Sequence, residues 1–183
     1  MATITLWMKR WLRRLGALML FMVLLVVLAM MRPSTDADRL TDAGGARVYV
    51  QDGDSLRIAN RALRLEGVDA VELHQLCRES AGAQWSCGVE AREALVALVA
   101  RGGLDCEARA SDRFGRALVR CSTAGSRDIA ADLVAQGWAV SGDGRGNGRY
   151  RAEELAARQA KRGIWRGTFE RPGAWRAAHP RVD

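Results

Sequence analysis

The chain has 183 residues, enough for one domain of ordinary size with an appended segment and too few for two large domains. With 49% hydrophobic and 27% charged residues, its composition excludes both a wholly disordered chain and a polytopic membrane protein. The net charge of +7 is uneven: Arg32 to Gly144 holds 14 Lys/Arg against 17 Asp/Glu, and Arg145 to Asp183 holds 10 against 4, so polyanion contacts are expected mainly in the C-terminal part.

The N-terminus carries a membrane signal. Residues 1–14 form a basic segment with Lys9, Arg10, Arg13 and Arg14, and residues 15–31 are 17 uncharged, mostly apolar residues. As a helix this run spans roughly 25 Å, near the lower limit for crossing a bilayer. The positive-inside bias then predicts a single-pass anchor in the inner (cytoplasmic) membrane, with the N-terminus in the cytoplasm and the domain outside. The alternative is a cleaved signal peptide and a secreted domain.

The rest of the chain is expected to contain a tether, one domain and a tail. Residues 32–45 are polar and end in Gly-Gly, which predicts a linker. Residues 46–170 are assigned to the compact domain, and residues 171–183 to a C-terminal tail.

Short β-branched and apolar runs open the domain. They predict a three-strand meander at Val48–Val50, Ser55–Ile58 and Ala62–Leu65. Helical spacing of apolar residues predicts a helix from Gly88 to Arg101, and two further runs, 104–110 and 117–121, predict a hairpin around the turn Asp112-Arg113-Phe114-Gly115.

Two more helices are expected after the hairpin. Ser126 is a candidate N-cap for a helix that ends at Gly137, and a last helix runs from about Tyr150 to Gly163. The order β-β-β-α-β-β-α-α predicts an α+β fold, a five-stranded β-barrel of the OB type with helices packed around it.

The four cysteines form no C-x-x-C pair, so a zinc cluster is not expected. Cys106 and Cys121 lie symmetrically about the hairpin turn and should face each other, which leaves Cys77 to pair with Cys87. Disulfides persist in an oxidising compartment, in agreement with an exported domain. The alternative is four buried free thiols in a cytosolic domain.

Charged residues at the ends of the meander carry the chemistry. Asp54 and Asp69 lie at positions that adjacent strands can bring together, and their oxygen ligands suit a hard cation such as Ca²⁺. Arg64 and Arg116 can converge on the same place, and Glu72 supplies a further carboxylate. A metal, fork-shaped cations and a carboxylate are what phosphodiester cleavage requires.

The order and spacing of these residues resemble the staphylococcal-nuclease-like (thermonuclease) family. The similar stretches are VYVQDGDSLRI, LRLEGVDAVE, DRFGRALVRC, DIAADLVAQGWAV and YRAEELAARQAKRGIW, which together span roughly residues 46 to 166. The resemblance implies the OB barrel, catalytic roles for Arg64, Glu72 and Arg116, and calcium ligation by Asp54, Asp69 and the main-chain oxygen of Ala70.

The chain departs from the family pattern in three places. Val71 stands where the family has a proline, Phe114 stands where it has a tyrosine, and the segment SGDGRGNGR replaces base-stacking tyrosines. Arg145, Arg149 and Arg151 are then candidates to hold a phosphate backbone. The alternative for these arginines is a solvated basic face.

The sequence thus predicts an enzyme: a membrane-anchored, extracytoplasmic, calcium-dependent nuclease that hydrolyses phosphodiester bonds of DNA or RNA. It is expected to be a monomer. The alternative is a non-catalytic OB-fold module of the cell envelope that binds nucleic acid or another polyanion.

Overall fold

The structure is a computed structural model that describes residues 2–30, 39–43, 45–142 and 148–180. The chain divides into two units, residues 1–36 and residues 37–183. The first unit contains helix α1 (Ala2–Met30). Within the described residues, no helix meets the combined requirement of length and apolar character for crossing a membrane.

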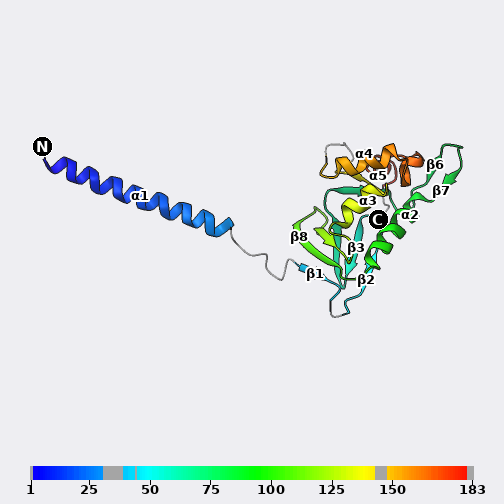
Figure 1. The fold of residues 1–183 in the computed structure, drawn as a ribbon, viewed down its shortest axis with the longest axis horizontal. Helices are drawn as coiled ribbons and strands as arrows, with labels where there is room; N and C mark the ends of the chain where they lie inside the picture. The colour runs from blue at the N-terminus through cyan, green and yellow to red at the C-terminus, as the bar shows by residue number, and fades with distance from the viewer. Residues whose placement is uncertain (1, 31–38, 44, 143–147, 181–183) are drawn as a thin grey trace. The chain divides into compact units, whose positions relative to one another are not determined.

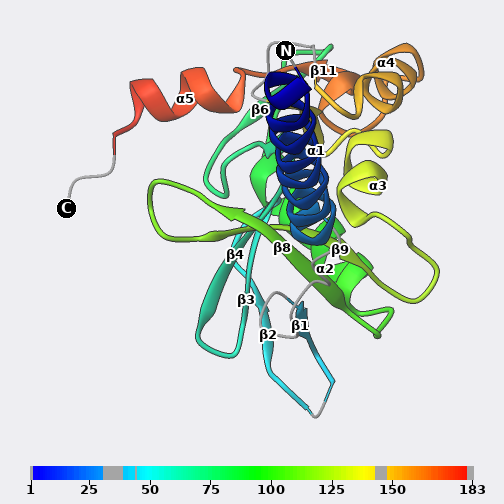
Figure 2. The same ribbon diagram turned by 90° about the vertical axis from the view of Figure 1, so that its left-hand side faces the viewer.

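The second unit is built on a mixed sheet of six strands in the order β1-β8-β9-β4-β3-β2 (Figures 1 and 2). The strands are β1 (Arg39–Thr41), β2 (Val48–Val50), β3 (Ser55–Ile58), β4 (Arg61–Leu65), β8 (Asp105–Ser111) and β9 (Ala117–Ser122). Neighbouring strands are antiparallel except β4 and β9, which are parallel. β4, which carries Arg64, therefore lies at the centre of the sheet.

Among the described residues, two small sheets and five short helical segments complete the unit. β5 (Val68–Ala70) pairs with β10 (Ala139–Ser141), and β6 (Cys77–Glu79) lies between β7 (Gln84–Trp85) and β11 (Gly167–Thr168). The helices are α2 (Cys87–Val99), α3 (Ile129–Ala135), α4 (Arg151–Gln159), the 3₁₀ helix η2 (Gly163–Arg166) and α5 (Pro172–Ala178).

Buried residues alternate with more exposed ones along the strands and recur at helical spacing along the helices, and together they form the core. In β9 the buried residues are every second one, Ala117, Val119 and Cys121. In α2, Leu95 and Leu98 are buried three residues apart. These residues belong to one core cluster that also contains Ile129 and Leu133 of α3, so the main sheet packs against α2 and α3.

The predicted strands and helices are confirmed, and the α+β character with them. All five expected strands occur in the main sheet, and helices occur at the three expected places. The sheet is an open, curled half-barrel: among the described residues no pairing joins its two ends, β1 and β2. The expectation of a closed five-stranded barrel is corrected in this respect.

Three local expectations also differ from the structure. β1 lies inside the stretch 32–45 that was expected to be a linker, where the guanidinium of Arg39 lies 2.8 Å from the carboxylate of Asp105 on β8. Helix α5 lies inside the expected tail 171–183. Asp128, and not Ser126, caps α3, because its extended backbone lets its carboxylate accept the N–H groups of Ala130 and Ala131.

Both predicted disulfides are present. Cys106 is bonded to Cys121 and Cys77 to Cys87, and among the described residues no cysteine is free. Cys106 and Cys121 are direct cross-strand partners in the β8–β9 ladder, as the symmetry about the turn predicts.

Candidate active site

The turn between β2 and β3 places Asp54 beneath the edge of the sheet. The carboxylate of Asp52 accepts the N–H of Asp54 at 3.0 Å and fixes the turn. Glycine is needed between them, because a Cβ on Gly53 would lie 2.7 Å from the Cβ of Ala70 and 3.0 Å from that of Ala91. The sequence Asp-Gly-Asp thus holds the turn tightly against β5 and α2.

Asp54 is a buried carboxylate, 2% exposed, with three hydrogen-bond donors. One oxygen accepts from the hydroxyl of Ser55 and from Arg64, both at 2.8 Å, and the other accepts the backbone N–H of Ala70 at 3.0 Å. Burial nevertheless raises the pKa of Asp54 to about 7, against the opposing charge of Arg64. Through these hydrogen bonds, Asp54 joins the start of β3, the central strand β4 and strand β5.

Arg64, on the central strand β4, joins two carboxylates. Its two terminal nitrogens lie 2.8 Å from Asp54 and 2.7 Å from Asp69. Burial works against the charged guanidinium, but the two carboxylates outweigh it and raise the pKa of Arg64. Asp69 lies on β5 and is 3% exposed, so Arg64 and both aspartates form one buried charged group.

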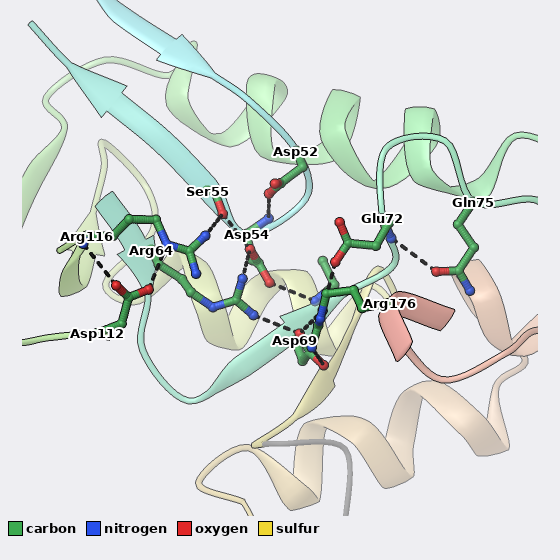
Figure 3. A network of polar contacts seen from close by, with 11 residues as sticks. Asp52, Asp54, Ser55, Arg64, Asp69, Glu72, Gln75, Asp112, Arg116 and Arg176 are labelled. Atoms are coloured by element: carbon green, nitrogen blue, oxygen red, sulfur yellow. Dashed lines mark hydrogen bonds and ion pairs between the residues drawn. The ribbon is translucent and has the colours of Figure 1, made fainter. Parts of the chain in front are cut away.

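A second arginine reaches this group from α5. Arg176 donates to both oxygens of Asp69, at 2.9 and 3.0 Å, and to Glu72 at 2.8 Å (Figure 3). The hydrogen bonds with Asp69, followed by those with Glu72, raise the pKa of Arg176. Arg176 thus links the expected metal ligand Asp69 to the expected general base Glu72.

The loop after β5 carries Glu72, and two neighbours fix its backbone. The buried side chain of Gln75 accepts the N–H of Glu72 at 3.1 Å and donates to the carbonyl of Glu170 at 2.6 Å. Gly88 of α2 packs so closely that a Cβ there would lie 1.8 Å from the carbonyl oxygen of Glu72. The position of Glu72 therefore depends on α2 and on the segment before α5.

Arg116 is held at the end of the β8–β9 hairpin. Its Nε donates to the carboxylate of Asp112 at 2.7 Å, and one terminal nitrogen lies 3.4 Å from the hydroxyl of Ser55. The same carboxylate accepts the N–H groups of Phe114 and Arg116. Asp112 therefore both closes the turn and orients the guanidinium of Arg116. Ser55 connects Arg116 to Asp54.

The structure therefore brings the predicted catalytic residues and the predicted metal-ligating residues into one network. Contacts run without interruption from Arg116 through Ser55, Asp54, Arg64, Asp69 and Arg176 to Glu72 (Figure 3). Ala70 also belongs to it, through its N–H to Asp54.

Sequence reasoning missed Ser55, Gln75, Asp112 and Arg176. Only Asp112 had a signal, because it opens the turn Asp112-Arg113-Phe114-Gly115 between the two predicted strands of the hairpin.

The basic segment after β10 is only partly described. Arg145 lies outside the described residues. Arg149 has its guanidinium 5.9 Å from the ring centre of Tyr150, and Arg151 is exposed at the start of α4. Within the residues that the structure describes, neither arginine forms a hydrogen bond or an ion pair with Asp54, Asp69 or Glu72.

The donor set suits a hard cation. Within the described residues, no group of three or more His, Cys, Asp or Glu side chains is arranged to hold a metal ion. The two buried carboxylates Asp54 and Asp69 nevertheless supply oxygen donors only, which is the donor type that a hard cation prefers. The residues present therefore fit Ca²⁺ in donor type.

Comparison with known proteins agrees with this geometry. Residues 62–167 match the family model described as staphylococcal nuclease homologue, which is more than half of the chain. The chain is also similar to the succinoglycan biosynthesis protein ExoI of Rhizobium meliloti (strain 1021), with 36% identity over 135 residues, 70% of this chain and 71% of that protein. The matched residues contain Arg64, Asp69, Glu72 and Arg116. The chain belongs to the staphylococcal nuclease family.

Proposed function

We propose that this protein is a calcium-dependent nuclease that hydrolyses phosphodiester bonds of DNA or RNA. Membership of the staphylococcal nuclease family points to cleavage or binding of nucleic acid. The single observation that carries the catalytic proposal is the continuous network in which two arginines and a carboxylate surround a buried pair of aspartates.

The arginines suit a phosphodiester substrate. Each terminal nitrogen of a guanidinium carries two hydrogens, so Arg64 can hold Asp54 and Asp69 and still donate to a phosphate oxygen. Asp112 holds the Nε edge of Arg116 and leaves its terminal nitrogens directed at the site. Two oriented guanidiniums stabilise the charge that develops on phosphorus-bound oxygens in the transition state.

Glu72 is the candidate general base. Its side chain is 16% exposed, so water reaches it, and its backbone is fixed by Gln75. From this position the carboxylate can accept a proton from an attacking water. Asp54, Asp69 and the main-chain oxygen of Ala70 would hold Ca²⁺, which supplies Lewis-acid stabilisation of phosphate charge when it is bound.

We further propose that the domain acts outside the cytoplasm, anchored by residues 15–31. The support comes from the apolar run, from the four basic residues before it and from the two disulfides, which suit an oxidising compartment. Membrane fractionation of the full chain tests this. We expect the protein to stay in the membrane after alkaline carbonate washing. Release of all of the protein would contradict an anchor and would favour the alternative, a cleaved signal peptide.

A second candidate function is a non-catalytic module that binds a polyanion of the cell envelope. The similar protein ExoI is named for succinoglycan biosynthesis and not for nucleic acid cleavage, which favours considering this alternative. Such a module would bind polyanions in a salt-sensitive way without turnover.

The decisive experiment measures hydrolysis by the full chain in detergent, with DNA and with RNA, in Ca²⁺ and in excess chelator. We expect hydrolysis in Ca²⁺ only.

Arg64→Lys and Arg116→Lys keep the charge but lose the bidentate fork, so kcat should fall much more than substrate affinity. Glu72→Gln should lower kcat by about 100-fold or more with little change in binding.

Arg109→Lys is the matched control for the arginine variants. Arg109 lies on β8 with a 41% exposed side chain and pairs with Glu107 on the same strand, away from the network described above. Parent-like rates in all three site variants would refute this site, and salt-sensitive binding without hydrolysis would establish the binding module.

A further inference from the structure

Arg176 occupies the acidic face of the site. Three hydrogen bonds join its guanidinium to the two oxygens of Asp69 and to Glu72. In Figure 3 the guanidinium lies between these two carboxylates, on the far side of Asp69 from Asp112 and Arg116. A positively charged group of this chain therefore already holds the carboxylates that the proposed function assigns to the metal and to the general base.

A divalent cation and Arg176 cannot both bind Asp69 favourably. One oxygen of Asp69 already accepts from Arg64 and from Arg176, so two positive groups converge on a single atom. A further charge of +2 on the same carboxylate would lie within a few ångströms of both guanidiniums, and like charges at that separation repel beside a carboxylate that is itself buried. One of the two guanidiniums therefore has to leave Asp69 when the divalent cation binds to it.

Arg176 is the group able to leave. Arg64 is 18% exposed, lies on the central strand and is held by two buried aspartates, whereas the side chain of Arg176 is 41% exposed. Arg176 belongs to the seven-residue helix α5, in which Pro172 is the buried residue. The hydrogen bond from Gln75 to Glu170 fixes the chain just before this helix, so α5 can move about that point while the domain stays intact.

We propose that Arg176 is a tethered cation that competes with the divalent metal for Asp69, so that α5 closes the site in the metal-free protein and is displaced when metal binds. The inference rests on the proposed function for the identity of the metal site. Displacement also frees Glu72 from its ion pair, which makes that carboxylate available to accept a proton. The apparent metal affinity of the parent is then the intrinsic affinity multiplied by the fraction of molecules in which Arg176 does not hold Asp69.

Calorimetric titration with CaCl₂ tests the competition in the full chain without any nucleic acid. Arg176→Gln and Arg176→Ala should bind Ca²⁺ about 10-fold or more tightly than the parent, within the range typical of coupled sites. Arg109→Ala, which removes an equally exposed, ion-paired arginine, should stay within about twofold of the parent. Equal or weaker binding by both Arg176 variants, or no Ca²⁺ binding by any chain, overturns the proposal.

Hydrogen exchange on the unsubstituted protein gives a second readout that does not depend on any variant folding. Saturating Ca²⁺ should increase amide exchange across residues 172–179 and decrease it in residues 52–54 and 69–72. Unchanged or slower exchange in α5 contradicts displacement. Neither measurement uses hydrolysis, so the two proposals can fail separately. If the Arg176 variants bind Ca²⁺ more tightly but no chain hydrolyses nucleic acid, only the proposed function is refuted. If the parent hydrolyses nucleic acid and the variants bind Ca²⁺ as the parent does, only the competition is refuted.

Discussion

Asp112 links the β8–β9 turn to the orientation of Arg116, and its protonation should therefore be visible in stability. Burial opposes ionisation, but hydrogen bonds from the side chain and N–H of Arg116 and from the N–H of Phe114 outweigh it and lower the pKa of Asp112 from 3.8. A lowered pKa contributes stability that is present above about pH 3.8, the unfolded value, and is lost as pH falls through the folded value.

Asp112→Asn should accordingly be less stable than the parent by about 1–3 kcal/mol at neutral pH, the range for hydrogen bonds to a charged group. The difference should shrink as pH falls below 3.8 towards the lower folded pKa. Urea unfolding of both proteins at a series of pH values measures it. A difference that does not change with pH would show that the charge on Asp112 is irrelevant.

Single residues were predictable where the sequence places them in a local pattern. Asp54, Arg64 and Asp69 lie within 16 residues of one another, on a turn and two strands that periodicity identifies, and the structure joins them. Arg176 is 107 residues from Asp69 and 104 from Glu72. No local pattern predicts that contact, because it depends on the path of the whole C-terminal segment.

Helix α2 approaches the loop that carries Glu72 closely at Gly88. Alanine favours a helix over glycine by about 1 kcal/mol, so propensity alone predicts that Gly88→Ala stabilises the protein. The new Cβ would lie 1.8 Å from the carbonyl oxygen of Glu72 and 2.6 Å from that of Leu73, however, so the loop or the helix has to move.

We therefore expect Gly88→Ala to destabilise the protein by about 1–3 kcal/mol, the usual cost of overpacking. It should also lower kcat, because Glu72 shifts. Denaturant unfolding and steady-state kinetics measure the two effects. Glu93→Ala, on the exposed face of α2, is the control and should behave like the parent in both. A stabilised, fully active Gly88→Ala protein would contradict the close packing.

Elements were predictable where the sequence carries a repeating or β-branched local pattern, as in the three-residue strand β2. α2 and the hairpin β8–β9 have several residues in register with a helical or alternating pattern, and the sequence analysis places them within two residues. β6, β7 and β11 contain two or three residues each, too few for a period to be detected. Their pairing depends on partners far along the chain, such as Gly167 of β11 with Glu79 of β6.

At the scale of the molecule, the core of the second unit contains two buried clusters, and each includes residues next to the site. The larger lies under the main sheet and includes Cys106 and Cys121. The smaller includes Val71, Cys77 and Cys87, beside the loop that carries Glu72. The hairpin made the disulfide pairing predictable, whereas the open edge between β1 and β2 was not, because closure depends on strand curvature that the pattern of apolar residues does not encode.

The two disulfides should therefore differ in their effect on activity. Replacing either pair with serine should cost about 2–5 kcal/mol of stability, the usual range for a native disulfide. Cys106 and Cys121 are joined across a continuous ladder that still pairs β8 with β9, so their loss should leave kcat nearly unchanged well below the unfolding temperature. The disulfide Cys77–Cys87 joins the end of the loop that carries Glu72 to the start of α2. Its loss should lower kcat because the side chain of Glu72 is then held less firmly. Thermal unfolding and kinetics of the two double variants at a temperature where both are folded measure this contrast. Equal kcat in both would mean that Gln75 and Gly88 hold Glu72 without help from the disulfide.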